Sequence, residues 1–107
     1  MKRQVMTTKN IAEIRKSFDK VLEIIKASGR VSPRYIEGLV YSLLSAIRAN
    51  DQERFLTYLI TFLNTFESKE VSEFMKKIYE NFPLSEESFQ KVGYLIIMGF
   101  MSVKGGE

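Results

Sequence analysis

The chain contains no cysteine, no histidine and no tryptophan among its 107 residues. Without cysteine and histidine it lacks thiolate and imidazole nucleophiles, the usual zinc and iron ligands, and the commonest general base near neutral pH. Many enzyme mechanisms depend on one of these groups. We therefore expect no catalytic residue, no metal site and no cofactor, and we interpret the chain as a protein that works by binding other macromolecules.

Long apolar runs are also missing. The longest, from Tyr94 to Met101, is far shorter than the roughly 20 residues that a membrane-spanning helix needs. No basic start is followed by an apolar run and a small-residue cleavage site, as a secretory signal requires. These absences predict a cytoplasmic protein without a membrane segment, and the shortage of histidine, cysteine and tryptophan beside abundant Lys, Glu and Ile is typical of a thermophile.

Hydrophobic residues make up 45% of the chain, which is enough to form the core of one domain of this length. Their spacing is helical in five segments, and no segment alternates as a strand does. We expect an all-α single domain (1–107), a compact bundle of about five helices between a basic N-terminal segment (1–9) and a flexible tail (104–107). The predicted helices cover residues 11–28, 33–49, 51–66, 69–81 and 86–103.

Cap residues mark the ends of these helices. Asn10 with Glu13, and Asn50 with Glu53, have the spacing of capping boxes, in which a polar side chain and a glutamate three residues later satisfy free backbone N–H groups. Gly29 suits the left-handed conformation that often ends a helix. The other start and stop signals are Ser32 before Pro33, and Pro83 before Ser85.

The third and fifth predicted helices are apolar on nearly every side. A bundle of this size has one fully surrounded position, so two such helices favour an apolar face that remains available to a partner. The alternative is that both helices simply belong to the core. Under the first interpretation the candidate interface residues are Phe62, Phe66, Ile97, Phe100 and Met101.

Positive charge is concentrated in the first half of the chain. Residues 1–48 contain ten basic and four acidic residues, so their balance is 10 − 4 = +6, although the whole chain carries only +3. Lys9, Lys16 and Lys20 share one line of the first helix, away from its apolar stripe. We predict that phosphates contact this half of the chain, through Lys9, Arg15, Lys16, Lys20, Arg30 and Arg34. A solvated charged face and a surface for acidic proteins are the alternatives.

Five tyrosines offer rings that could stack on bases, although such residues also commonly form the edges of a core. A helix-turn-helix formed by the second and third helices would read DNA poorly, since its recognition helix offers only Arg54 among apolar, Thr and Asn residues. We therefore expect contacts to a nucleic-acid backbone rather than recognition of a DNA sequence.

The chain ends in YLIIMGFMSVKGGE, an apolar helix that closes on Lys104, Gly105 and Gly106. In this ending, in its length and helix order, and in its basic first half, it resembles the small-subunit family of CRISPR effector complexes, especially those of type I-A and type III. The resemblance implies a non-catalytic subunit of an antiviral defence ribonucleoprotein. Several copies would stack along the guide-RNA complex, beside other effector subunits, with basic side chains along the target or displaced strand. The alternative function is a helical adaptor that binds proteins without contacting nucleic acid.

Overall fold

The computed structural model describes the backbone of residues 6–105 and the side chains of residues 6–103, and over this range the chain is all-helical, without a strand. The all-α prediction is confirmed. The five helices are α1 (Thr8–Ser28), α2 (Pro33–Arg48), α3 (Gln52–Leu63), α4 (Lys69–Asn81) and α5 (Glu86–Gly105). The predicted segment 1–9 therefore contributes its last two residues to α1. The predicted tail begins inside α5, and residues 1–5 and 106–107 lie outside the described part.

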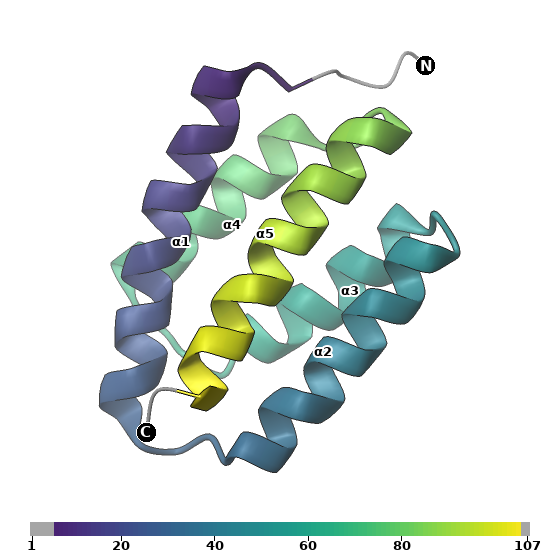
Figure 1. The fold of residues 1–107 in the computed structure, drawn as a ribbon. Helices are drawn as coiled ribbons and strands as arrows, with labels where there is room; N and C mark the ends of the chain where they lie inside the picture. The colour runs from purple at the N-terminus through teal and green to yellow at the C-terminus, as the bar shows by residue number, and fades with distance from the viewer. Residues whose placement is uncertain (1–5, 106–107) are drawn as a thin grey trace.

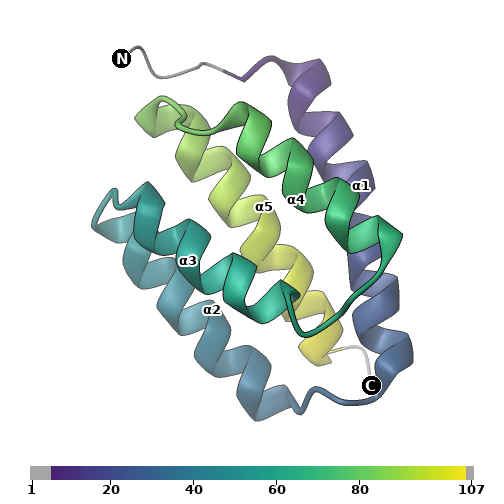
Figure 2. The same ribbon diagram turned by 180° about the vertical axis from the view of Figure 1, so that it is seen from behind.

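Helix α5 lies at the centre of the bundle, although it comes last in the chain (Figure 1). It packs against α1 on one side and α2 on the other, while α4 covers α1 and α3 covers α2 from behind (Figure 2). Two glycines permit the close approach of α5. A Cβ on Gly93 would lie 2.5 Å from Cδ1 of Ile47, and one on Gly99 would lie 2.5 Å from Cε2 of Phe18.

Aromatic rings fill the core between these helices. Phe18 of α1 packs against Phe74 of α4 and Phe100 of α5, with ring centres 5.1 and 5.2 Å apart. Phe100 also meets Phe62 of α3 edge-on at 5.5 Å. Edge-to-face and tilted pairs at these distances are favourable beyond the area that they bury. The core therefore extends from α4 through α1 and α5 to α3 without a break.

The predicted starts of the second, fourth and fifth helices are confirmed, the third begins one residue later than predicted, and two caps differ from the prediction. The side chain of Thr7, not Asn10, caps α1 by accepting the N–H of Asn10, and Asn10 stands at the third helical position. Asp51, not Asn50, caps α3 by accepting the N–H of Arg54. Asn50 instead adopts a left-handed conformation with a φ of 52° in the tight turn before the helix.

Gln52 at the start of α3 is buried and binds the backbone of Leu84 in the connection between α4 and α5. Its Nε2 donates to the Leu84 carbonyl oxygen at 2.7 Å, and its Oε1 accepts the Leu84 N–H at 2.8 Å. Only 7% of Gln52 is exposed. This pair of hydrogen bonds satisfies both polar groups of a buried backbone segment.

Four of the five predicted interface residues lie in the core: Phe62, Phe66, Ile97 and Phe100 are each at most 5% exposed. They cannot present a face to a partner in this fold, so the interface prediction is wrong for them. The physical reason is that Phe100 packs against Phe18 of α1 and Phe62 of α3, while a turn after α3 brings Phe66 against Phe62. Met101, by contrast, is 49% exposed.

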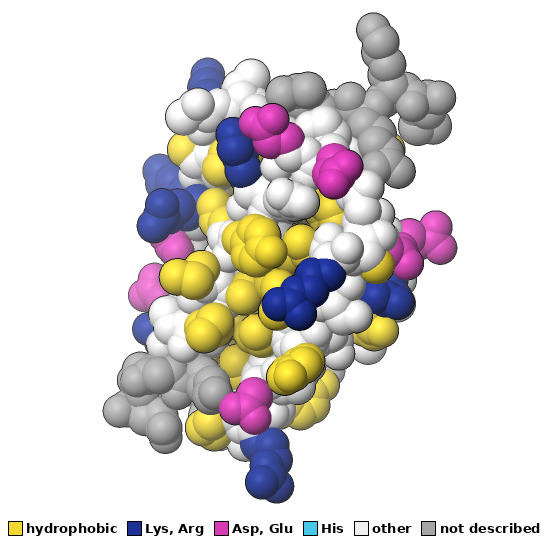
Figure 3. All heavy atoms as spheres, turned by 45° about the vertical axis from the view of Figure 1, so that its right-hand side comes forward, with side chains coloured by type: hydrophobic (Ala, Val, Ile, Leu, Met, Phe, Trp, Pro, Cys, Tyr) yellow, Lys and Arg dark blue, Asp and Glu magenta, His cyan; other side chains and the backbone are white. Residues whose placement is uncertain are grey.

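The outward side of α5 is nevertheless apolar. Tyr94, Met98 and Met101 follow one another at helical spacing on this side, and all three are exposed. Figure 3 shows hydrophobic side chains gathered on the face that α5 and α2 form. The fifth helix therefore leaves an apolar face exposed, and of the five predicted interface residues only Met101 lies on it, together with Tyr94 and Met98.

Candidate nucleic-acid interface

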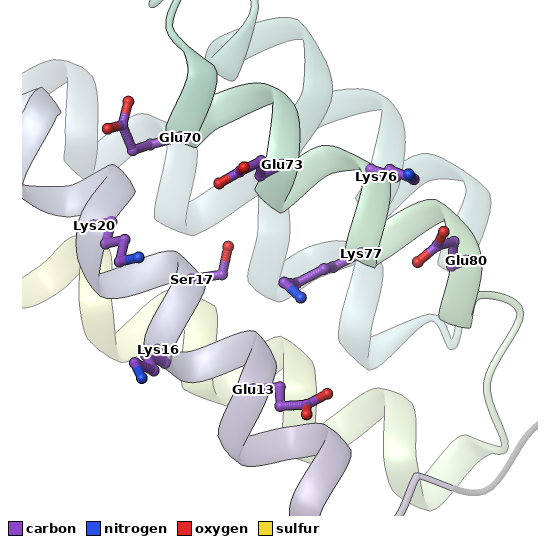
Figure 4. A pocket seen from close by; sticks show the side chains of 9 residues that line it. All are labelled: Glu13, Lys16, Ser17, Lys20, Glu70, Glu73, Lys76, Lys77 and Glu80. Carbon is purple, nitrogen blue, oxygen red and sulfur yellow. The ribbon is translucent and has the colours of Figure 1, made fainter.

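The three α1 lysines predicted to contact phosphate are all exposed. Lys16 and Lys20 line a groove between α1 and α4, which Lys76 and Lys77 of α4 line as well. Figure 4 shows carboxylates interspersed among these amines on both helices. The groove contains four lysines and also four glutamates, which are Glu13, Glu70, Glu73 and Glu80. The formal charges of the groove cancel. It therefore attracts a phosphate backbone less than the lysines of α1 would without the glutamates beside them.

Arg15 lies on the other flank of α1, in a groove between α1 and α5 that also contains Asp19 and Lys91. Lys91 in turn forms an exposed ion pair with Glu87, with 3.3 Å between nitrogen and oxygen. Lys9 stands in the first turn of α1, away from both grooves. The fold thus separates Arg15 from Lys16 and Lys20, although they are neighbours in sequence.

Arg30 has a structural role in the connection between α1 and α2. Its Nη2 donates to the carbonyl oxygen of Thr65 at 2.9 Å, and its guanidinium lies 4.8 Å from the centre of the Phe66 ring. Both contacts reach the segment after α3. Arg30 therefore ties two loops together, and this use of its guanidinium limits its availability to a phosphate.

Arg34 lies in the first turn of α2, in a groove between α2 and α3. Tyr35 and Tyr58 line the groove with it, and three hydroxyl groups, from Ser42, Thr57 and Thr61, face the same space. No residue among those that line this groove is acidic. Arg34 is therefore the member of the predicted set that lies in a groove lined by aromatic rings and hydroxyl groups, and none of the residues that line this groove is acidic.

A second groove follows along the C-terminal half of α2. Tyr41 and Leu44 line it together with Arg48 and with Arg54 of α3, and again none of its lining residues is acidic. Arg54 donates from Nη2 to the hydroxyl oxygen of Ser45 at 3.1 Å. Consequently both grooves along α2 combine arginine with tyrosine.

We call the combined region the α2 arginine–tyrosine surface; its residues are Arg34, Tyr35, Tyr41, Arg48, Arg54 and Tyr58. Arg34, Tyr41 and Arg48 are spaced seven residues apart, which places them on one line of α2, outside its buried stripe. Glu37, three residues after Arg34 and four before Tyr41, is on the same side of α2 but does not line either groove. The line from Arg34 to Arg48 is about 21 Å long at 1.5 Å per residue.

Sequence reasoning had missed Arg48 and Arg54 as site residues. The seven-residue spacing of Arg34, Tyr41 and Arg48 was a signal that could have identified Arg48. Arg54 carried no comparable signal, because it joins the surface only through the packing of α3 beside α2.

Within the described part of the chain, no helix is long and apolar enough to cross a membrane. The same residues include no cluster of three or more Asp or Glu side chains suited to a metal ion. Comparisons with protein-family models, with curated proteins and with solved structures find no match to this chain.

Proposed function

We propose that this chain is a non-catalytic structural small subunit of a cytoplasmic CRISPR RNA-guided effector complex, where it contacts a nucleic-acid backbone and neighbouring subunits. The observation that carries the nucleic-acid part is the α2 arginine–tyrosine surface. Three arginines stand there over about 21 Å without an acidic residue in either groove. The resemblance described above supports the larger assembly, with several copies of the chain along the target or displaced strand.

Arginine suits this task because its planar guanidinium stays charged and can donate two parallel hydrogen bonds to a phosphate. Such contacts hold a strand in place without reading its bases. The exposed Arg15 and Lys9 can add long-range attraction. Lys16 and Lys20 contribute least, because four glutamates share their groove.

Two groups of basic residues allow a matched test of the backbone contact. The double variant Arg34→Gln with Arg48→Gln removes two charges from the α2 arginine–tyrosine surface. The double variant Lys16→Gln with Lys20→Gln removes the same charge from the balanced groove. We expect the first to weaken strand binding by the assembled complex at least tenfold, and the second to weaken it little. Equal effects of the two variants would contradict the proposed surface.

The assembly part is tested separately, by purifying the tagged chain from its native source. We expect guide RNA and the other effector subunits to accompany it. Purification of the folded chain without any RNA would contradict membership of such a complex.

A second candidate function, a protein-binding helical adaptor, is favoured by the outward side of α5. Met98 is 65% exposed there, between the exposed Tyr94 and Met101. An adaptor that docks through this side would lose its partner on replacement Met98→Glu and would keep it on loss of the α2 arginines. Added salt separates the two functions, since phosphate contacts weaken steeply with salt and apolar contacts do not.

A further inference from the structure

Three of the five tyrosines stand in the acid-free grooves along α2. Tyr41 is 76% exposed and Tyr35 is 56% exposed, while Tyr58 is exposed to a lesser degree. The hydroxyl groups of these three residues make no hydrogen bond to another described residue. Their rings are thus large apolar groups that the fold neither buries nor anchors through the hydroxyl.

The ring of Tyr35 is supported on one side by the core. Its centre lies 5.6 Å from that of Phe62, and the two planes are inclined by 37°. Phe62 is itself held between Phe66 and Phe100, with ring centres 5.3 and 5.5 Å away. Because the core fixes the ring from behind, Tyr35 offers a rigid aromatic surface that loses little entropy on binding a flat ligand.

Arginines are placed at both ends of this row of rings. Arg34 adjoins Tyr35 at the start of α2, and Tyr41 follows about two turns further along the helix. Arg48, about four turns from Arg34, shares a groove with Tyr41 and with Arg54 of α3. Cations placed beside exposed aromatic rings match a single strand, which carries phosphates beside unpaired bases. A duplex matches the rings poorly, because the faces of its bases are stacked on one another and cannot reach them.

We infer that the α2 arginine–tyrosine surface binds single-stranded nucleic acid, with Tyr35, Tyr41 and Tyr58 stacking on bases while the three arginines contact phosphates. The length of the surface corresponds to a strand of on the order of four to six nucleotides. Stacking is tolerant of sequence because every base presents a flat face. This inference rests on the proposed function and narrows its ligand to an unpaired strand.

The test uses the full chain and three fluorescent probes at low salt: oligothymidylate of about twelve nucleotides, a duplex of the same length, and an abasic strand with the same number of phosphates. Binding is followed by fluorescence anisotropy of the label. Since the chain has no tryptophan, its tyrosine emission reports stacking directly. We expect the oligothymidylate to bind at least tenfold more tightly than either other probe and to quench tyrosine emission.

The matched variants are Tyr41→Leu and Tyr35→Leu, with Tyr79→Leu as the control. Tyr79 is 59% exposed on α4, outside both grooves, so its replacement tests a tyrosine of similar exposure elsewhere. Each replacement in the grooves should weaken single-strand binding by between about five- and a hundredfold, and the control should leave it unchanged. Circular dichroism verifies that each variant keeps its helical fold.

Equal affinity for the three probes would overturn the inference, as would unchanged binding by both groove variants. If the Arg34→Gln and Arg48→Gln variant then still weakens binding, the proposed backbone contact survives and only stacking fails. Failure of the full chain to bind any probe also overturns the inference, and the assembled-complex experiment above decides the proposed function separately. If the tyrosine variants lose a protein partner but still bind the strand, the grooves are protein-docking sites and the inference is overturned.

Discussion

Replacement of Gln52 by alanine tests how the bundle holds the connection between α4 and α5. The change removes two hydrogen bonds, of 2.7 and 2.8 Å, and leaves the N–H and carbonyl groups of Leu84 without their partner. Leu84 is fully buried, so its backbone groups regain water only if the segment opens. An orphaned buried polar group costs about 1–3 kcal/mol, and the pair therefore costs about 2–6 kcal/mol.

This loss corresponds to a decrease in Tm of roughly 10–30 °C for a domain of about 100 residues. Thermal and urea unfolding, followed by circular dichroism at 222 nm, measure it, provided that both give a single transition. Gln90→Ala is the matched control, because Gln90 is exposed on α5 and the same atoms are removed there. A loss below about 0.5 kcal/mol for Gln52→Ala, the range of ordinary surface changes, would refute the reasoning.

Three further replacements test the caps, the central helix and the loop contacts by the same unfolding measurements. Thr7→Ala should destabilise the domain by about 1 kcal/mol through loss of the α1 cap, and a greater loss on Asn10→Ala would reverse the assignment of these two positions. Gly99→Ala should lose about 1–2 kcal/mol, since the new methyl meets the rigid Phe18 ring. Gly93→Ala should cost less, because its close contacts are with the flexible side chain of Ile47 and Phe55 lies at an ordinary 3.6 Å; equal losses would contradict this. Arg30→Gln should lower stability by about 1 kcal/mol without altering the salt dependence of strand binding, and a change in that dependence would indicate a phosphate contact.

The number of helices and the all-α fold class could be predicted from the sequence, because the apolar spacing and the cap residues agree along most of the chain. The fourth helix is predicted without error at Lys69–Asn81, where Ser68 accepts the N–H of Val71 as a cap should. The caps of α1 and α3 were misplaced where several polar residues in a row can each serve as a cap. Local sequence does not distinguish such neighbours, since the choice depends on which register buries the apolar stripe.

The burial of individual apolar faces was less predictable. Spacing alone shows that Phe62 and Phe100 lie on apolar sides of their helices, but it does not show that these rings meet at 5.5 Å. The end of α3 illustrates the same limit. The helix stops at Leu63, and a turn in which the Phe66 N–H donates to the Leu63 carbonyl oxygen directs Phe66 into the core.

The candidate site was only partly predictable for a related reason. The position of Arg34 outside the apolar stripe could be read from the sequence, and it lies in the proposed surface. The neutral balance of the groove around Lys16 and Lys20 could not be read, because its glutamates come mainly from α4, some 50 residues later in the chain. Charge counted along a sequence therefore differs from charge summed over a surface whenever a distant helix packs alongside.

The most direct test of the central claim is the salt dependence of strand binding by the assembled complex, compared between the wild-type chain and the triple variant Arg34→Gln, Arg48→Gln and Arg54→Gln. Each phosphate contact to a single strand contributes about 0.7 to the slope of log K against log salt, so three lost contacts should lower the slope by about two units for each copy that touches the strand. A complex that assembles normally with the triple variant, and binds its strand with unchanged affinity and slope, would contradict the claim that this chain holds nucleic acid through α2.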